Sequence, residues 1–133
     1  MVTVFVDTSA LFAVLDADDA NHLSAGRIWR NLLDEREDML TSNYVLIEAL
    51  ALIQRRLGFE ARRTFQADVA GVLQARWIDV ALHSAGVAAL LTAGRRDLSL
   101  VDCVSFEVMR RLGLTSAFAF DVDFSDQGFR CLV

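Results

Sequence analysis

Hydrophobic positions along the chain fall into short apolar runs and into longer stretches with helical spacing. The first run, 2–6, is β-branched and apolar and stops at an acid, which is typical of a buried parallel strand. Further strands are predicted at 39–41, 77–82, 116–120 and 129–133. Helices are predicted at 9–15, 23–36, 44–57, 60–73 and 84–93, and from Ser99 to a stop at Gly113.

Several residues mark where these helices begin and end. Ser42 or Asn43 is expected to cap the helix at 44–57, and Gly58 is placed to end it. Ser99 and Asp102 have the spacing of a capping box in front of an apolar helix. Because strands alternate with helices, the sequence predicts an α/β fold with a parallel sheet, whose ligands bind beyond the carboxyl ends of the strands.

Composition fits one domain over 1–133, since the chain has no proline, no low-complexity segment and 54% hydrophobic residues. The two cysteines, Cys103 and Cys131, are far apart and are expected to be reduced, which favours a cytoplasmic location. No apolar run is long enough to cross a membrane. The apolar N-terminal run lacks a basic leader and is interrupted by Asp7, so it is expected to be a strand and not an export signal.

Two acids stand where chemistry is expected. Asp7 directly follows the first strand, where it could also serve only as a helix cap. Glu48 interrupts an apolar helix face, and burying an ionised carboxylate there costs several kcal/mol unless a cation or hydrogen bonds compensate it. The alternative for Glu48 is a side chain that reaches solvent or pairs with an arginine.

Three more acids lie in the C-terminal third. Asp102 starts a helix, where it could be a ligand, the end of a capping box, or both. Asp121 and Asp123 leave the strand at 116–120, where a solvated loop is the alternative. The acids at 16, 18, 19 and 126 are interpreted as ordinary connector charges.

The candidate acids can meet at one edge of a parallel sheet. Two of them follow strands, one lies on an apolar helix face and one lies at a helix start. Packed carboxylates raise one another's pKa unless a cation binds among them. Hard oxygen ligands suit Mg²⁺ or Mn²⁺, and such ions support phosphodiester hydrolysis.

The motif at 6–10, followed in order by Glu48, the segment 99–102 and the segment 120–124, resembles the PIN-domain ribonucleases. Order, spacing and length are most similar to the toxin halves of VapBC-type toxin–antitoxin pairs. The resemblance implies a three-layer α/β/α sandwich with a mostly parallel sheet and a Mg²⁺- or Mn²⁺-dependent endoribonuclease that blocks translation.

The resemblance also implies roles for individual residues. The acids Asp7, Glu48, Asp102 and Asp121 are expected to be catalytic and metal-binding, with Asp123 as a further metal ligand. Thr8 or Ser9 is expected to contact substrate. The resemblance further implies a homodimer and a small inhibitory antitoxin protein. His22 and His83 have no role in this chemistry.

The charge balance leaves open how RNA is attracted. The net charge is −5, and all thirteen basic residues are arginines. Four arginine pairs are candidates for phosphate contacts, although helix ends and solvated faces explain them as well: 55–56, 62–63, 95–96 and 110–111.

Other functions fit the sequence less well. The absence of lysine argues against a phosphorylated receiver domain, and no P-loop motif is present. A PIN-like module that binds RNA or protein without cutting, and a nuclease that acts on DNA, remain open alternatives.

Overall fold

A five-stranded, fully parallel sheet forms the centre of the protein in a computed structural model that describes residues 2–132. The strand order is β3-β2-β1-β4-β5. The strands are β1 (Thr3–Val6), β2 (Asp38–Ser42), β3 (Gln74–Arg76), β4 (Ser116–Phe118) and β5 (Arg130–Cys131). The predicted α/β class and parallel sheet are confirmed.

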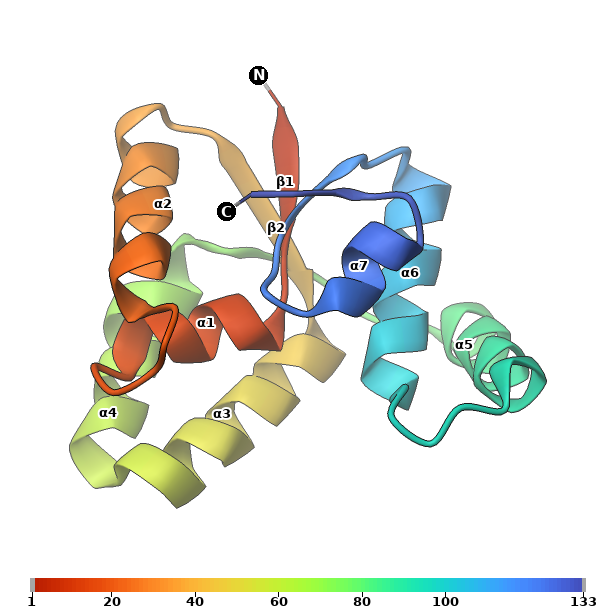
Figure 1. Ribbon diagram of the computed structural model, residues 1–133, viewed down its shortest axis with the longest axis horizontal. Helices are drawn as coiled ribbons and strands as arrows, with labels where there is room; N and C mark the ends of the chain where they lie inside the picture. Colours follow the sequence, from red (N-terminus) through yellow and green to blue (C-terminus); the bar gives the residue numbers. More distant parts are fainter. Residues whose placement is uncertain (1, 133) are drawn as a thin grey trace.

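Helices cover the sheet on both sides, as Figure 1 shows, with α1, α2 and α4 to the left of the strands and α5 and α6 to the right. The helices are α1 (Thr8–Leu15), α2 (His22–Asp34), α3 (Asn43–Leu57), α4 (Phe59–Thr64), α5 (Val80–Ala93), α6 (Leu100–Leu112) and α7 (Val122–Asp126). None of the helices within residues 2–132 is long and apolar enough to cross a membrane.

The core lies between these layers. Phe5 and Val6 of β1 and Phe118 of β4 are fully buried in the centre of the sheet, which explains the apolar run at the start of the chain. Phe124 of α7 packs on Phe5 and Phe106, so the short last helix is part of the same core. Both cysteines are free, as predicted, with Cys103 buried and Cys131 half-buried.

Local signals placed most helix ends correctly. Ser42 caps α3 by accepting a hydrogen bond from the Val45 amide at 3.1 Å, and α3 ends at Gly58. The capping box between Ser99 and Asp102 is present at the start of α6. α6 ends at Gly113, whose φ of 69° lies in the left-handed region that glycine adopts freely.

The strand predicted at 77–82 is wrong. The strand is β3, three residues earlier, and α5 has already begun at Val80 because the Asp79 carboxylate accepts a hydrogen bond from the Leu82 amide at 2.9 Å. The Ile78 amide donates a hydrogen bond at 2.7 Å to the side chain of Asn43, the first residue of α3. This amide is therefore not paired with a neighbouring strand. A short apolar run without clear alternation suits a helix start as well as a strand.

Three other boundaries differ from the prediction. The helix expected at 60–73 divides into α4, a π-helical turn (Phe65–Val69) and a 3₁₀ turn (Ala70–Val72). β4 stops at Phe118 instead of 120, and α7 follows, with Asp121 as its N-cap and Asp123 in its first turn, which does not fit the alternative of a solvated loop. β5 is shorter than the strand predicted at 129–133, whose last residue lies outside the described part of the chain.

Candidate active site

The predicted acids gather at the carboxyl ends of β1 and β4, the two central neighbours in the sheet. Asp7 follows β1 directly, and Asp121 follows β4 by three residues. From β1 the chain continues to β2 on one side, whereas β4 lies on the other side, so this edge is a topological switch point. Switch points are where open α/β sheets bind their ligands.

Asp7 is a buried carboxylate with two local partners. Its Oδ2 accepts hydrogen bonds from the Ser9 amide at 3.2 Å and from the Ser9 hydroxyl at 2.7 Å, and Asp7 caps α1. Burial raises the pKa of Asp7 to about 7, against the lowering effect of the Ser9 hydrogen bonds. The cap predicted as the simple alternative is therefore present, but it does not compensate the cost of burying this charge.

Ser9 connects the exits of the two central strands. Its hydroxyl donates to Asp7 and accepts a hydrogen bond from the Phe120 amide at 3.0 Å. The Asp7 amide also donates to the Phe118 carbonyl oxygen at 3.0 Å. Ser9 thus orients Asp7 and holds the β4 exit beside it, whereas a direct substrate contact had been expected of Thr8 or Ser9.

Asp102 combines a cap with a place in the acidic site. The Ser99 amide donates to its Oδ2 at 3.2 Å, and the Ser99 hydroxyl accepts from the Asp102 amide at 3.1 Å. Burial raises the pKa of Asp102, opposed by the Ser99 hydrogen bonds, and the charges of Asp121 and Glu48 raise it further. Asp102 therefore lies close to two of the other predicted acids.

Glu48 is half-buried on α3 rather than fully buried as its apolar neighbours suggested. Ala51, one turn further along the helix, is exposed, so Glu48 lies at the border of the apolar face. The burial argument for Glu48 is weaker than expected. Its charge nevertheless acts on Asp102 and places Glu48 beside the cluster.

Three acids lie close enough to share one cation. Asp102, Asp121 and Asp123 each offer a carboxylate oxygen, and these oxygens lie within 4.8 Å of one another. Asp121 caps α7 by accepting from the Asp123 amide at 2.9 Å, and burial raises the pKa of Asp121. Asp123, whose side chain is 6% exposed, accepts a hydrogen bond from Arg95 at 2.8 Å.

The donor set fits a hard divalent cation. Every donor in the group is a carboxylate oxygen, the ligand type that Mg²⁺ and Mn²⁺ prefer. The Thr8 hydroxyl, next to Asp7, is buried and has no hydrogen-bond partner among residues 2–132. Buried polar atoms without partners are rare, and this one belongs to the residue that directly follows Asp7 in the sequence.

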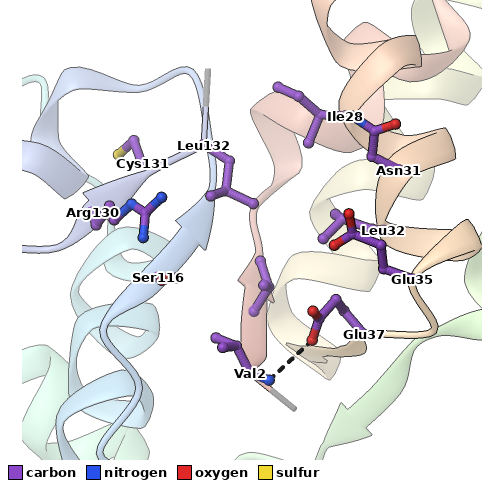
Figure 2. Close-up of a pocket in the computed structure, with 11 residues that line it drawn as sticks. Val2, Ile28, Asn31, Leu32, Glu35, Glu37, Ser116, Arg130, Cys131 and Leu132 are labelled. Atoms are coloured by element: carbon purple, nitrogen blue, oxygen red, sulfur yellow. Dashed lines mark hydrogen bonds between the residues drawn. The ribbon is translucent and has the colours of Figure 1, made fainter.

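A cavity of about 550 Å³ lies elsewhere, at the amino ends of the strands. Figure 2 shows it between α2 and β5, with Ile28 and Leu32 on one wall and Cys131 and Leu132 on the other. The Val2 amide donates to Glu37 at 3.0 Å along its edge. None of the predicted site residues lines this cavity, so the candidate site is defined by the acids and not by the cavity.

Sequence reasoning grouped Arg95 with Arg96 as one of four equivalent pairs and missed its contact with the site. Arg95 forms ion pairs with Asp97 and with Asp123, which is 28 residues away. The only signal in the sequence was that Arg95 lies in a connector just before the capping box. The histidines stay apart from the acids: His22 contacts the Ala13 carbonyl oxygen, and His83 contacts the Tyr44 hydroxyl.

A family model described as the PIN domain matches residues 4–130. This chain is a PIN-domain protein. Among characterised relatives, the PIN domain is 37% identical over 127 residues to the 23S rRNA-specific endonuclease VapC20 from two strains of Mycobacterium tuberculosis, with 95% of each chain covered. The prediction of a PIN-domain endoribonuclease of the toxin class is confirmed by this relationship.

Solved structures agree with the fold. The crystal structure of Mycobacterium tuberculosis VapC20, a toxin that cleaves the sarcin–ricin loop, matches with a TM-score of 0.83 at 36% identity over 95% of both chains. PAE2754 from Pyrobaculum aerophilum matches with a TM-score of 0.66 at 18% identity, covering 98% of this chain and 90% of the other. FitAcB from Neisseria gonorrhoeae matches with a TM-score of 0.65 at 13% identity, covering 98% and 96%. The last two similarities concern the fold alone.

Proposed function

We propose that this PIN domain hydrolyses RNA with Mg²⁺ or Mn²⁺ held by Asp7, Glu48, Asp102 and Asp121, with Asp123 as a further ligand. The observation that carries the metal site is the group of three carboxylates within 4.8 Å of one another. The charge of Asp102 acts on Asp7, and the charge of Glu48 acts on Asp102, which supports including Asp7 and Glu48 in the acidic site. Five carboxylates in one place oppose folding unless positive charge binds among them.

The bound cations would supply the positive charge that activates an attacking water and offsets charge on the phosphate. The residues of the chain hold the carboxylates in position: Ser9 fixes Asp7, and Ser99 fixes Asp102. The water oxygen attacks phosphorus, the bond to the leaving oxygen breaks, and that oxygen takes up a proton. No side chain forms a covalent intermediate in this scheme.

Thr8 is the better of the two predicted hydroxyls for contact with bound substrate or ion. Its Oγ1 has no partner in the described part of the chain, whereas the hydroxyl of Ser9 already joins Asp7 to the Phe120 amide. Thr8→Val keeps the shape and removes the hydroxyl. Unchanged cleavage and cation affinity in that variant would show that Thr8 has no part in the site.

Ribosomal RNA is the substrate class that we propose. The relative VapC20 acts on 23S rRNA, and 37% identity over nearly the full length of both chains supports a similar target here. The proposal brings with it a cytoplasmic location, where ribosomes are found.

Cleavage of ribosomal RNA by the purified protein tests this function. Intact ribosomes and total RNA are incubated with the protein and Mn²⁺, and new RNA ends are mapped. We expect a small number of discrete cuts in the large-subunit RNA, none in EDTA, and a loss of at least about a hundredfold in rate for Asp102→Asn, since the ligand charge is lost. Asp126→Asn, an exposed acid outside the site, is the matched control. Equal cleavage by the Asp102→Asn variant contradicts the assignment.

A homodimer and a small antitoxin remain proposals. Two large apolar side chains near the start of α5 are exposed, Trp77 at 73% and Val80 at 82%, as an interface requires. Light scattering that gives a monomer mass at micromolar concentration would exclude the dimer. Co-expression with the product of a neighbouring short reading frame, followed by purification, tests for the antitoxin.

A further inference from the structure

Arg95 lies at the edge of the acidic site, in the connector between α5 and α6. Its Nε donates to Asp97 Oδ1 at 3.3 Å, and its Nη2 donates to Asp97 Oδ2 at 3.0 Å. The same Nη2 donates to Asp123 Oδ1 at 2.8 Å. One guanidinium therefore joins the connector to an acid that shares the 4.8 Å group with Asp102 and Asp121.

Counting donors shows what this guanidinium has left. Arginine carries five N–H groups in one plane, and three of them are engaged by Asp97 and Asp123. Both N–H groups of Nη1 lack a partner among residues 2–132. Asp97 accepts from the edge of the guanidinium that carries the Nε hydrogen and one Nη2 hydrogen. The second Nη2 hydrogen, which reaches Asp123, therefore lies on the edge that Nη2 shares with Nη1. One N–H of Nη1 points in the same direction, toward the side of the guanidinium on which Asp123 lies.

The ion pair between Arg95 and Asp97 fixes the position of the guanidinium more than it stabilises the fold, whereas the pair with Asp123 involves a carboxylate that is only 6% exposed. The side chains of Arg95 and Asp97 are 42% and 74% exposed, and exposed pairs contribute little to folding. Within the described residues, Arg95 is the only cation that forms an ion pair with one of the proposed ligands. Its planar fork matches phosphate geometry, and an acidic site needs such a cation to accept a polyanion.

Resting on the function proposed above, we propose that Arg95 binds a phosphodiester group of the RNA at the cleavage site. Nη1 donates to a non-bridging phosphate oxygen, while Asp97 and Asp123 hold the guanidinium plane in place. Arg95 would then be a substrate-contacting residue of the site, and Asp97 a positioning residue that acts through it.

The neighbouring Arg96 provides a matched control. It is exposed, carries the same charge in the same connector, and makes no ion pair or side-chain hydrogen bond in the part of the chain that the structure describes. Arg95→Ala should lower kcat/KM for RNA cleavage roughly ten- to a hundredfold, as the loss of a charged hydrogen bond does. Arg96→Ala should stay within about threefold of the wild type. Equal losses in the two variants overturn the proposal.

Cation binding separates a phosphate contact from a merely structural role. Calorimetric titration with Mn²⁺ in the absence of RNA should show no loss of affinity in the Arg95→Ala variant, because removing a positive charge does not weaken the attraction between the carboxylates and the cation. If Mn²⁺ affinity falls as far as kcat/KM does, Arg95 only orients Asp123, and the proposal is wrong. Arg95→Lys keeps the charge without the fork and should lie between wild type and Arg95→Ala. It also serves if the alanine variant folds poorly.

Salt dependence supplies a second readout. Removing one phosphate contact should make the decline of log kcat/KM with log salt concentration shallower by about 0.7 for single-stranded RNA in Arg95→Ala. Arg96→Ala should keep the wild-type slope, and equal slopes in all three proteins contradict a phosphate contact. A wild type that cuts no RNA would overturn both the proposed function and this inference. A wild type that cuts RNA, with Arg95→Ala equally active, would overturn this inference alone.

Discussion

At the scale of single residues, the site is built from side chains that serve the backbone and the chemistry together. Asp7 caps α1, Asp102 completes a capping box, and Asp121 caps α7. Helix starts offer free amide groups and a partial positive charge, both of which favour a carboxylate. Three helix starts directed at one edge of the sheet therefore collect acids that would otherwise repel one another.

The buried carboxylate of Asp7 should make the cation-free protein less stable as pH rises. Burial raises the pKa of Asp7 from 3.8 to about 7, so the folded chain keeps a proton that the unfolded chain releases between these values. The contribution of Asp7 to stability is therefore complete below pH 4 and is lost as pH rises to 7. The loss is on the order of 4 kcal/mol.

Asp7→Asn removes this titration, and asparagine still caps a helix. Denaturant unfolding in EDTA should give the variant a flatter pH profile between about pH 4 and pH 7, and a higher free energy of unfolding at pH 8. Asp18→Asn, an exposed acid outside the site, should follow the wild type. If both variants keep the wild-type profile, Asp7 is not the source of the pH dependence.

At the scale of elements, the sequence predicts helix ends that are set by residues close together in the chain. It misses a strand that is set by pairing with another strand of the sheet. Ser42 and Gly58 located both ends of α3 because their side-chain and backbone preferences act within a few residues. β3 was missed because all three of its residues, Gln74–Arg76, are exposed and it is held only by pairing with β2. No alternation of apolar residues marks such an edge strand.

The same limit applies to the site. Asp7 and Asp121 could be predicted because they follow apolar strands, and the carboxyl ends of parallel strands meet at one edge. The contact between Arg95 and Asp123 could not, since it joins a connector without any pattern to a helix 28 residues later. The half-buried position of Glu48 was missed because apolar neighbours on a helix do not show how far the rest of the protein covers that helix face.

The packing of α5 against α6 depends on one glycine. A Cβ at Gly86 would lie 2.4 Å from Val104 Cγ2 and 3.3 Å from the Val104 amide nitrogen. Valine has one strongly preferred side-chain rotamer in a helix, so Cγ2 cannot easily move away. Gly86→Ala should therefore lower the free energy of unfolding by about 1–3 kcal/mol, although alanine favours helix formation over glycine.

Denaturant unfolding measures this effect, with Gly71→Ala as the control, because a Cβ there meets no atom within 4 Å. Combining Gly86→Ala with Val104→Ala should cost less than the sum of the two single changes, since the second removes the methyl group that clashes. Strict additivity would show that the two helices do not depend on this contact.

At the scale of the whole molecule, the fold brings five acids from four segments to one edge of a protein whose net charge is −5. Burial raises the pKa values of Asp7, Asp102 and Asp121, and the charges of neighbouring acids raise them further, so the ionised carboxylates are unfavourable without a cation. The geometry that supports the proposed chemistry therefore costs stability in the cation-free state.

Mn²⁺ should recover that stability, because an ion that binds only the folded chain shifts the unfolding equilibrium. At a hundred times its Kd, the gain is about 2.7 kcal/mol, which corresponds to a rise in Tm on the order of 10 °C for a domain of this size. Thermal unfolding in Mn²⁺ is compared with unfolding in NaCl of equal ionic strength, which should produce a much smaller rise. Asp102→Asn should lose most of the Mn²⁺ effect, while Asp126→Asn should keep it. If Mn²⁺ raised the Tm of Asp102→Asn as much as that of the wild type, the cation would bind elsewhere. Asp102 belongs to the three-acid group, and the charges of Asp121 and Glu48 act on it.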